Sequence, residues 1–285
     1  MRKDGYLGKS LFVISDSLFG AQYRALMIFG LIIFATVLHG QEYKLVQTIA
    51  TDAHYFSTDK LQNLYLVSPK NEVVKYDKTG REIFRYNNNR LGDLMLIDAN
   101  NPFKIGLFYP ELGNFIFLDR TMTDVGSFRF YDYNFIQIDA VALAADNNIW
   151  LYDKLDFQLK KINQAGKIVF ESGDLSLTIN RPLSPNFMVE REQQIYLNDP
   201  TVGILVFDVF GQFEKILEFK GLTKFQILDG KLLFFQNGKL QAFNLQSLLM
   251  QEVKLPEGVG EKAEVLVQKN RMYVLEIGAL QVFEF

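Results

Sequence analysis

The chain has 285 residues, 48% of them apolar, which is enough material for the core of one large folded domain. Its formal net charge is only −3, so the composition gives no reason to expect nucleic acid as a partner. It contains no cysteine, which excludes disulfides, thiol catalysis and thiolate metal sites. The 26 Phe and 13 Tyr residues, together with frequent Val, Ile and Leu, favour β-strands.

The first forty residues differ from the rest of the chain. Residues 25–38 read ALMIFGLIIFATVL, an unbroken apolar stretch preceded by Arg24. A membrane-spanning helix needs about 20 apolar residues, and this stretch is shorter. We therefore expect residues 1–40 to be a signal peptide cleaved near Gly40, with an uncleaved anchor as the alternative. The mature chain would then be periplasmic or secreted and would contain no membrane span.

From residue 64 onward, one plan of short apolar runs and turns repeats along the chain. The first run of each copy begins at Leu64, Ile105, Ile149, Ile195, Leu232 and Met272. The steps between these positions are 41, 44, 46, 37 and 40 residues. Repeats of roughly 40 to 50 residues are typical of propeller blades and of helical arrays. Because the runs are short and rich in β-branched and aromatic residues, strands are the better interpretation.

Turn residues recur at fixed places within the copies. Asp or Asn follows the second run in five copies, at Asp77, Asp119, Asn163, Asp208 and Asn244. Glycine follows three residues later at Gly80, Gly166 and Gly211. The acidic or amide side chain can cap a turn, and glycine accepts the positive φ that closes a hairpin. Each copy therefore predicts a four-stranded sheet.

The sixth copy ends at Phe285, before the fourth strand that the other five copies contain. An unfinished sheet would leave an unpaired edge. Residues 43–49 (YKLVQTI) precede the first copy and can supply the missing strand. We therefore predict an all-β, six-bladed β-propeller that occupies residues 41–285 as one domain, with its last blade closed by the N-terminal strand of the mature chain.

The strands NLYLV and NNIWLYDK and the turns YDKTG, INQAG and FDVFG resemble those of six-bladed β-propellers of the NHL and TolB-like group. Within this group, the segment NDPTVGILVFDVFGQF resembles small secreted propellers of Bacteroidetes. The turn glycines that define the NHL repeat are missing from the second and fifth copies. The resemblance implies an architecture, and it identifies no binding residue.

An Asp-Ala dipeptide precedes or enters the first strand of three consecutive blades, at Asp52, Asp98 and Asp139. If these positions are equivalent, three carboxylates converge at one mouth of the channel, where they can bind a divalent cation such as calcium. Metal-dependent lactonases of the six-bladed group use carboxylates and amides near the axis, so a hydrolase of that type is one hypothesis. In the other interpretation each aspartate caps a local turn, and no cofactor is expected.

Two connections between blades carry candidate partner-binding residues. In FRFYDYNFIQI, we expect Phe128 and Phe130 to pack inward and Tyr131 and Tyr133 to be exposed, where they can bind a protein or a sugar. The second connection, residues 174–186, contains Arg181, and three interpretations stay open: it covers one end of the channel, presents a loop to a partner, or is a plain surface loop.

No catalytic motif is present in the sequence. The mature chain keeps a single histidine, His54, and has no nucleophile elbow, no P-loop and no HExxH. The sequence therefore favours a non-catalytic, exported interaction platform, for example an accessory subunit of a cell-envelope assembly that binds another envelope protein. The metal-dependent hydrolase is the alternative.

Overall fold

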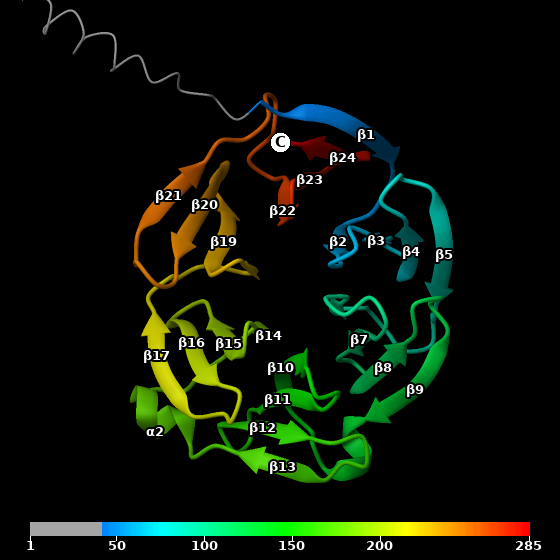
Figure 1. Cartoon of the computed structure of the whole chain (residues 1–285). Helices are drawn as coiled ribbons and strands as arrows, with labels where there is room; N and C mark the ends of the chain where they lie inside the picture. The colour runs from blue at the N-terminus through cyan, green and yellow to red at the C-terminus, as the bar shows by residue number, and fades with distance from the viewer. Residues whose placement is uncertain (1–41) are drawn as a thin grey trace, which may run out of the picture. The chain divides into compact units, whose positions relative to one another are not determined.

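Turn residues interrupt the apolar runs every few positions, and this keeps the strands short. A computed structural model describes residues 42–285, and these residues form six antiparallel four-stranded sheets. The sheets stand around a central axis as the blades of a β-propeller (Figure 1). The predicted all-β, six-bladed fold is confirmed.

In each blade the strands follow one another from the axis outward. The first two blades are β2 (Tyr55–Thr58), β3 (Leu64–Val67), β4 (Glu72–Tyr76) and β5 (Glu82–Asn87), then β6 (Leu96–Asp98), β7 (Ile105–Tyr109), β8 (Asn114–Leu118) and β9 (Asp124–Arg129). The next two are β10 (Ile138–Leu143), β11 (Ile149–Asp153), β12 (Gln158–Ile162) and β13 (Ile168–Glu171), then β14 (Phe187–Arg191), β15 (Gln194–Asp199), β16 (Gly203–Asp208) and β17 (Phe213–Leu217). Blade 5 is β18 (Gln226–Leu228), β19 (Lys231–Gln236), β20 (Lys239–Asn244) and β21 (Met250–Val253).

Blade 6 combines the two ends of the described chain. It consists of β22 (Glu264–Gln268), β23 (Arg271–Glu276), β24 (Ala279–Glu284) and, as its outermost strand, β1 (Lys44–Ala50). Strand β1 pairs antiparallel with β24, from Lys44 opposite Glu284 to Ala50 opposite Ala279, with one irregularity between Leu45 and Gln47. The predicted closure of the last blade by the N-terminal strand is confirmed.

The predicted turn residues close the outer hairpins. One side-chain oxygen of each accepts two backbone N–H groups of its own turn; the five residues are Asp77, Asp119, Asn163, Asp208 and Asn244. The predicted glycines at positions 80, 166 and 211 have positive φ. In blade 2 the left-handed residue of the same turn is Met122, and in blade 5 a turn one residue longer places Leu248 in this conformation, in both cases at a cost in backbone strain.

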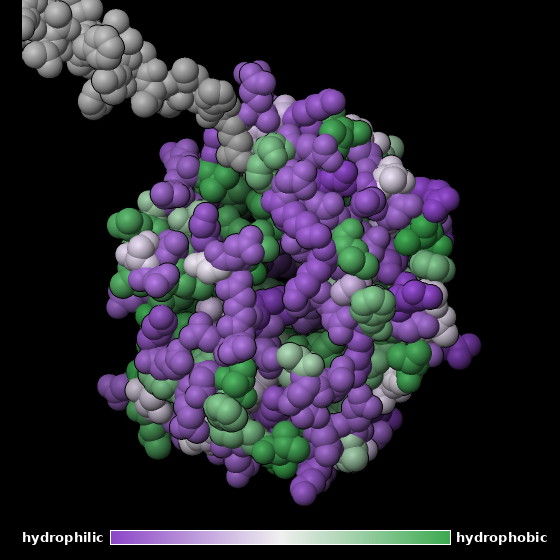
Figure 2. Space-filling view, viewed as in Figure 1, coloured by the Kyte–Doolittle hydropathy of each residue, from purple (hydrophilic) through white to green (hydrophobic). Residues whose placement is uncertain are grey.

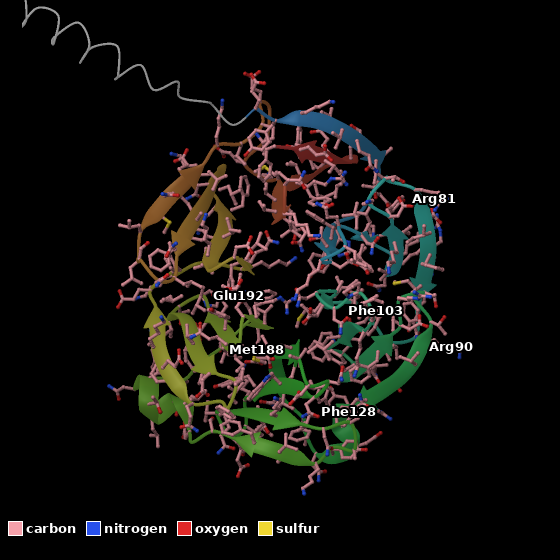
Figure 3. The ribbon with its side chains drawn as sticks, in the orientation of Figure 1. Arg81, Arg90, Phe103, Phe128, Met188 and Glu192 are labelled. Atoms are coloured by element: carbon pink, nitrogen blue, oxygen red, sulfur yellow. The ribbon has the colours of Figure 1, made fainter. Side chains whose placement is uncertain are left out.

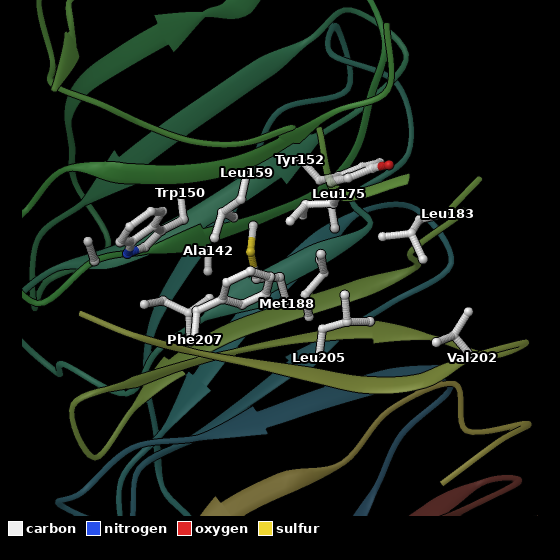
Figure 4. Close-up of a cluster of buried hydrophobic side chains, with 14 residues drawn as sticks. Ala142, Trp150, Tyr152, Leu159, Leu175, Leu183, Met188, Val202, Leu205 and Phe207 are labelled. Atoms are coloured by element: carbon white, nitrogen blue, oxygen red, sulfur yellow. The ribbon is translucent and has the colours of Figure 1, made fainter. Parts of the chain in front are cut away.

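The hydrophobic core is divided into six clusters, each between two neighbouring blades of residues 42–285. Figure 4 shows the cluster between blades 3 and 4, where Trp150 and Met188 pack with Leu205 and Phe207. Trp150 Nε1 also donates a hydrogen bond of 2.6 Å to Glu190 Oε2 of the next blade. A blade has apolar side chains on both faces, so it depends on both neighbours for burial.

Two short helices interrupt the connections between blades. The 3-10 helix η1 (Phe130–Tyr133) joins blades 2 and 3, and α2 (Leu175–Ile179) joins blades 3 and 4. Within residues 42–285, no helix has the length and apolar character needed to cross a membrane. The predicted signal peptide, residues 1–40, lies outside the described residues and remains a prediction.

Candidate functional site

The two faces of the propeller follow from the direction of the innermost strands. We call the face where each innermost strand begins the start face, and the opposite one the end face. Because the strands of a blade are antiparallel, the start face carries the connections between blades and the loops between second and third strands.

A cavity of about 810 Å³ lies around the axis, and we call it the axial cavity. In the space-filling view a narrow opening marks the centre of the ring (Figure 2). The axial cavity is lined by residues of blades 1, 2, 4, 5 and 6, and among the described residues none from blade 3 contributes to this lining. Glu192, which follows β14, borders it beside the central opening (Figure 3). The cavity is therefore off-centre, away from blade 3.

An ion pair explains why blade 3 is cut off from the axial cavity. Arg191 at the end of β14 donates from Nη2 to Asp98 Oδ1 at the end of β6, over 2.8 Å. Blade 4 thus bonds directly to blade 2, and the pair lies between blade 3 and the axis. Behind it, Val141 of blade 3 packs in one cluster with Leu96 and Phe187 of the flanking blades.

A second set of charged contacts lies toward the start face. Lys224, two residues before β18, has its Nζ 3.3 Å from Glu264 Oε1 and 3.5 Å from the centre of the Tyr55 ring. The Tyr55 hydroxyl donates in turn to the Ile97 carbonyl oxygen over 3.5 Å. These contacts connect blades 5, 6, 1 and 2 around the cavity.

Burial shifts the ionisation of all three groups. It lowers the pKa of Lys224, although the Glu264 carboxylate acts in the opposite direction. It raises the pKa of Glu264, against the attraction of Lys224, and it raises the pKa of the Tyr55 phenol. The Lys224 side chain is nevertheless 45% exposed and that of Glu264 25%, so the ion pair stands in a partly hydrated part of the cavity that a ligand can reach.

A second hollow of about 410 Å³ lies on the start face between blades 2 and 3, and we call it the interblade groove. Its lining includes Phe108, Pro110, Tyr131, Ile136, Asp139 and Lys154. An ion pair of 3.0 Å joins Lys154 Nζ and Asp139 Oδ2. Exposed apolar side chains belong to the same segments: Leu112 is 42% exposed, Ile136 61% and Leu155 52%.

The two predicted tyrosines of η1 have different surroundings. Tyr131 lines the interblade groove, is 38% exposed, and donates from its hydroxyl to the Glu111 carbonyl oxygen over 3.4 Å. The Tyr133 ring stacks on Phe128, 4.7 Å between centroids, and lies against Gly166, where a β-carbon would collide with it. Tyr133 thus helps to pack blade 2 against blade 3. Phe128 and Phe130 are buried, as predicted.

Arg181 lies elsewhere, in the connection between blades 3 and 4. Its Nη2 donates to Thr201 Oγ1 over 3.1 Å, and the residue lines neither the axial cavity nor the interblade groove. The structure therefore does not bring Arg181 together with Tyr131.

The three aspartates do not converge, because their positions are not equivalent. Asp98 is the last residue of β6 and lies at the end face, paired with Arg191. Asp139 is the second residue of β10 and lies at the start face, paired with Lys154. Asp52 precedes β2 and is exposed. The assumed alignment of the Asp-Ala dipeptides was wrong, and residues 42–285 contain no group of three His, Asp or Glu side chains that can hold a metal ion.

Comparisons with known proteins add information on the fold. No family model matches the sequence, and no curated protein does. Among solved structures, BamB from Moraxella catarrhalis is similar, with a TM-score of 0.50 and 12% identity over 86% of this chain and 98% of that chain. A virginiamycin B lyase from Staphylococcus aureus has a TM-score of 0.56 and 9% identity, over 86% and 100%. The Swd1 β-propeller domain from Myceliophteria thermophila has 0.56 and 10%, over 86% and 100%. At such identities the likeness shows the β-propeller fold alone.

Proposed function

We propose that this chain is a non-catalytic protein-interaction module that holds a segment of a partner protein in the interblade groove. One observation carries the proposal: exposed Tyr131 and Ile136 line a hollow, and exposed Leu112 and Leu155 belong to the segments that border it. Single exposed apolar residues are ordinary, whereas several around one hollow are typical of a binding surface.

The groove offers both kinds of contact that a bound segment needs. Tyr131 presents an aromatic surface held in place by its hydrogen bond to Glu111 and by the close approach of Gly113. Such aromatic anchors carry much of the binding energy in protein interfaces. Asp139 and Lys154 at the lining supply an acceptor and a donor that can engage the backbone of the partner.

We further propose that the module acts outside the cytoplasm, as an accessory subunit of a cell-envelope assembly, and that its partner is another envelope protein. The apolar residues 25–38 support export. The turn sequences YDKTG, INQAG and FDVFG support a place in the NHL and TolB-like group. The hydrolase hypothesis required Asp52, Asp98 and Asp139 to meet, and no other observation favours it.

The test compares two substitutions of exposed apolar residues. Ile136→Ser removes an apolar contact from the groove, whereas Leu177→Ser, on α2 and 79% exposed, is the matched control. Tagged wild type and both variants are purified from the native envelope, and co-purifying proteins are quantified by mass spectrometry. Burial of one such side chain is worth about 1.5–3 kcal/mol, so Ile136→Ser should weaken partner binding by about tenfold or more.

The expected result is one partner recovered in near-equal amount with wild type and Leu177→Ser, and depleted with Ile136→Ser. Recovery of that partner in equal amount with all three proteins would place the binding surface outside the groove. Purification of the wild type alone would count against the interaction module itself.

A further inference from the structure

We propose that the axial cavity is a second site, which binds a small organic anion with an apolar body and anchors it on Lys224. This proposal is independent of the interblade groove. The volume of about 810 Å³ lies within the roughly 300–1,000 Å³ that small-molecule sites occupy.

The contacts of Lys224 leave room for a second anion. An ammonium group has three N–H donors, and among the described residues the polar partner of Lys224 is Glu264. Their 3.3 Å separation is long compared with the roughly 2.7–2.9 Å of a good charge-assisted hydrogen bond. A carboxylate or sulfonate that enters the cavity can therefore form a shorter bond to the same ammonium.

The Tyr55 ring fixes where that ammonium stands. Nζ lies 3.5 Å from the ring centre, so the aromatic face holds the charge by a cation–π interaction. The Tyr55 hydroxyl is held by the Ile97 carbonyl oxygen, which orients the ring. The donor is thus positioned before any ligand arrives, and this lowers the entropic cost of binding.

Apolar side chains provide the surface for the body of the ligand. Phe187, Val189, Phe225 and Phe234 all contribute to the cavity lining, and each belongs to, or directly precedes, an inner strand of blade 4 or 5. Lys224 lies at the start of the same blade 5. A ligand with an acid group at one end and an apolar chain or ring at the other matches this arrangement.

The charge of the cavity favours an anion over a cation. Five Lys or Arg residues and four Asp or Glu residues line it, although the chain as a whole carries −3. The aromatic face of Tyr55, which would attract a cationic ligand, is already occupied by Lys224. Burial lowers the pKa of Lys224, whereas a further anion beside Nζ would favour its charged form.

The test uses octanoate as the probe, with octanol and octyltrimethylammonium as its neutral and cationic counterparts. Binding to the protein is measured by calorimetry and by displacement of anilinonaphthalenesulfonate fluorescence. Lys224→Met removes the charge and keeps the length of the side chain. The matched control is Lys239→Met, at an exposed ion pair on β20 of the same blade.

We expect octanoate to bind at one site in wild type and Lys239→Met, and to bind about ten- to a hundredfold more weakly in Lys224→Met, as loss of a charged hydrogen bond implies. Glu264→Gln removes the carboxylate that competes for Lys224, so octanoate should bind several-fold more tightly. Both variants break the same ion pair, and mere loss of folding would therefore weaken binding in both. Equal affinity in wild type and Lys224→Met, preference for the cationic probe, or no saturable binding of octanoate would each overturn the proposal.

Discussion

The Asp98–Arg191 ion pair stands between blade 3 and the axis, and replacing Arg191 by methionine tests how much it stabilises the ring. The Asp98 side chain is 4% exposed, and without Arg191 it keeps one hydrogen bond, from the Asn100 backbone N–H at 3.2 Å. Leaving a buried carboxylate without its cation costs about 3 kcal/mol of unfolding free energy.

The reverse substitution should cost less. In Asp98→Asn, Arg191 still donates to the Glu190 carbonyl oxygen over 2.8 Å, and its side chain is 20% exposed. We expect a loss of about 1–2 kcal/mol. In the double variant the uncompensated carboxylate is gone, so the two effects should not add, and the coupling energy should be about 2 kcal/mol.

Urea unfolding followed by the fluorescence of Trp150, the single tryptophan, measures these differences. The matched control is the exposed pair Lys239–Glu252, whose side chains are 58% and 54% exposed, for which the coupling should stay below about 0.5 kcal/mol. A coupling for Asp98–Arg191 as small as that of the control would refute the idea that this pair holds blades 2 and 4 together.

Three further predictions follow from the turns, from a buried carboxylate and from the ring closure. Leu248→Gly should raise the free energy of unfolding by about 1 kcal/mol, since Leu248 is 60% exposed and has φ 59°; a lower urea midpoint would contradict this. Burial alone would raise the pKa of Asp199, but hydrogen bonds from Ser184 N and Thr201 hold it below the usual value. The stabilisation that ionised Asp199 gives the folded state is therefore complete above about pH 4 and is lost as pH falls through the lower folded pKa. In Asp199→Asn the urea midpoint should fall less steeply with decreasing pH than in wild type, and an unchanged slope would contradict this role of Asp199. Removing residues 42–50 should leave β24 unpaired and produce oligomers in size-exclusion chromatography, whereas a stable monomer would argue against the closure.

The outer parts of the blades were predictable because their signals act locally. Asp77 bonds to the backbone of its own turn, and Gly80 closes that turn, so both can be read within a few residues of sequence. Strand β1 was predictable because the sixth copy of the repeat lacks its fourth strand, and β1 precedes the first copy without belonging to it. Met122 and Leu248 show the limit of the glycine signal, since they adopt the same backbone conformation without it.

The contacts around the axis could not be predicted from the sequence. Asp98 and Arg191 are 93 residues apart, and they meet because the ring brings the ends of β6 and β14 together across blade 3. The innermost strands also lack a turn residue that would mark where each one begins. Asp98 is the last of the three residues of β6, whereas Asp139 is the second of the six residues of β10. Tyr131 was predicted to be exposed from its own segment, whereas the acidic and basic groups beside it, Asp139 and Lys154, come from blade 3.

The pairing of β1 with β24 also determines the order in which the ring can form. Strand β1 is made before blade 1 yet finds its partner only when β24, in the last residues of the chain, is available. Until then two strand edges stay open, and open edges are sites of aggregation and of chaperone action. The final step joins segments far apart in the sequence, so we expect the pairing of β1 with β24 to be late and slow, and to follow the formation of blades 1 to 5.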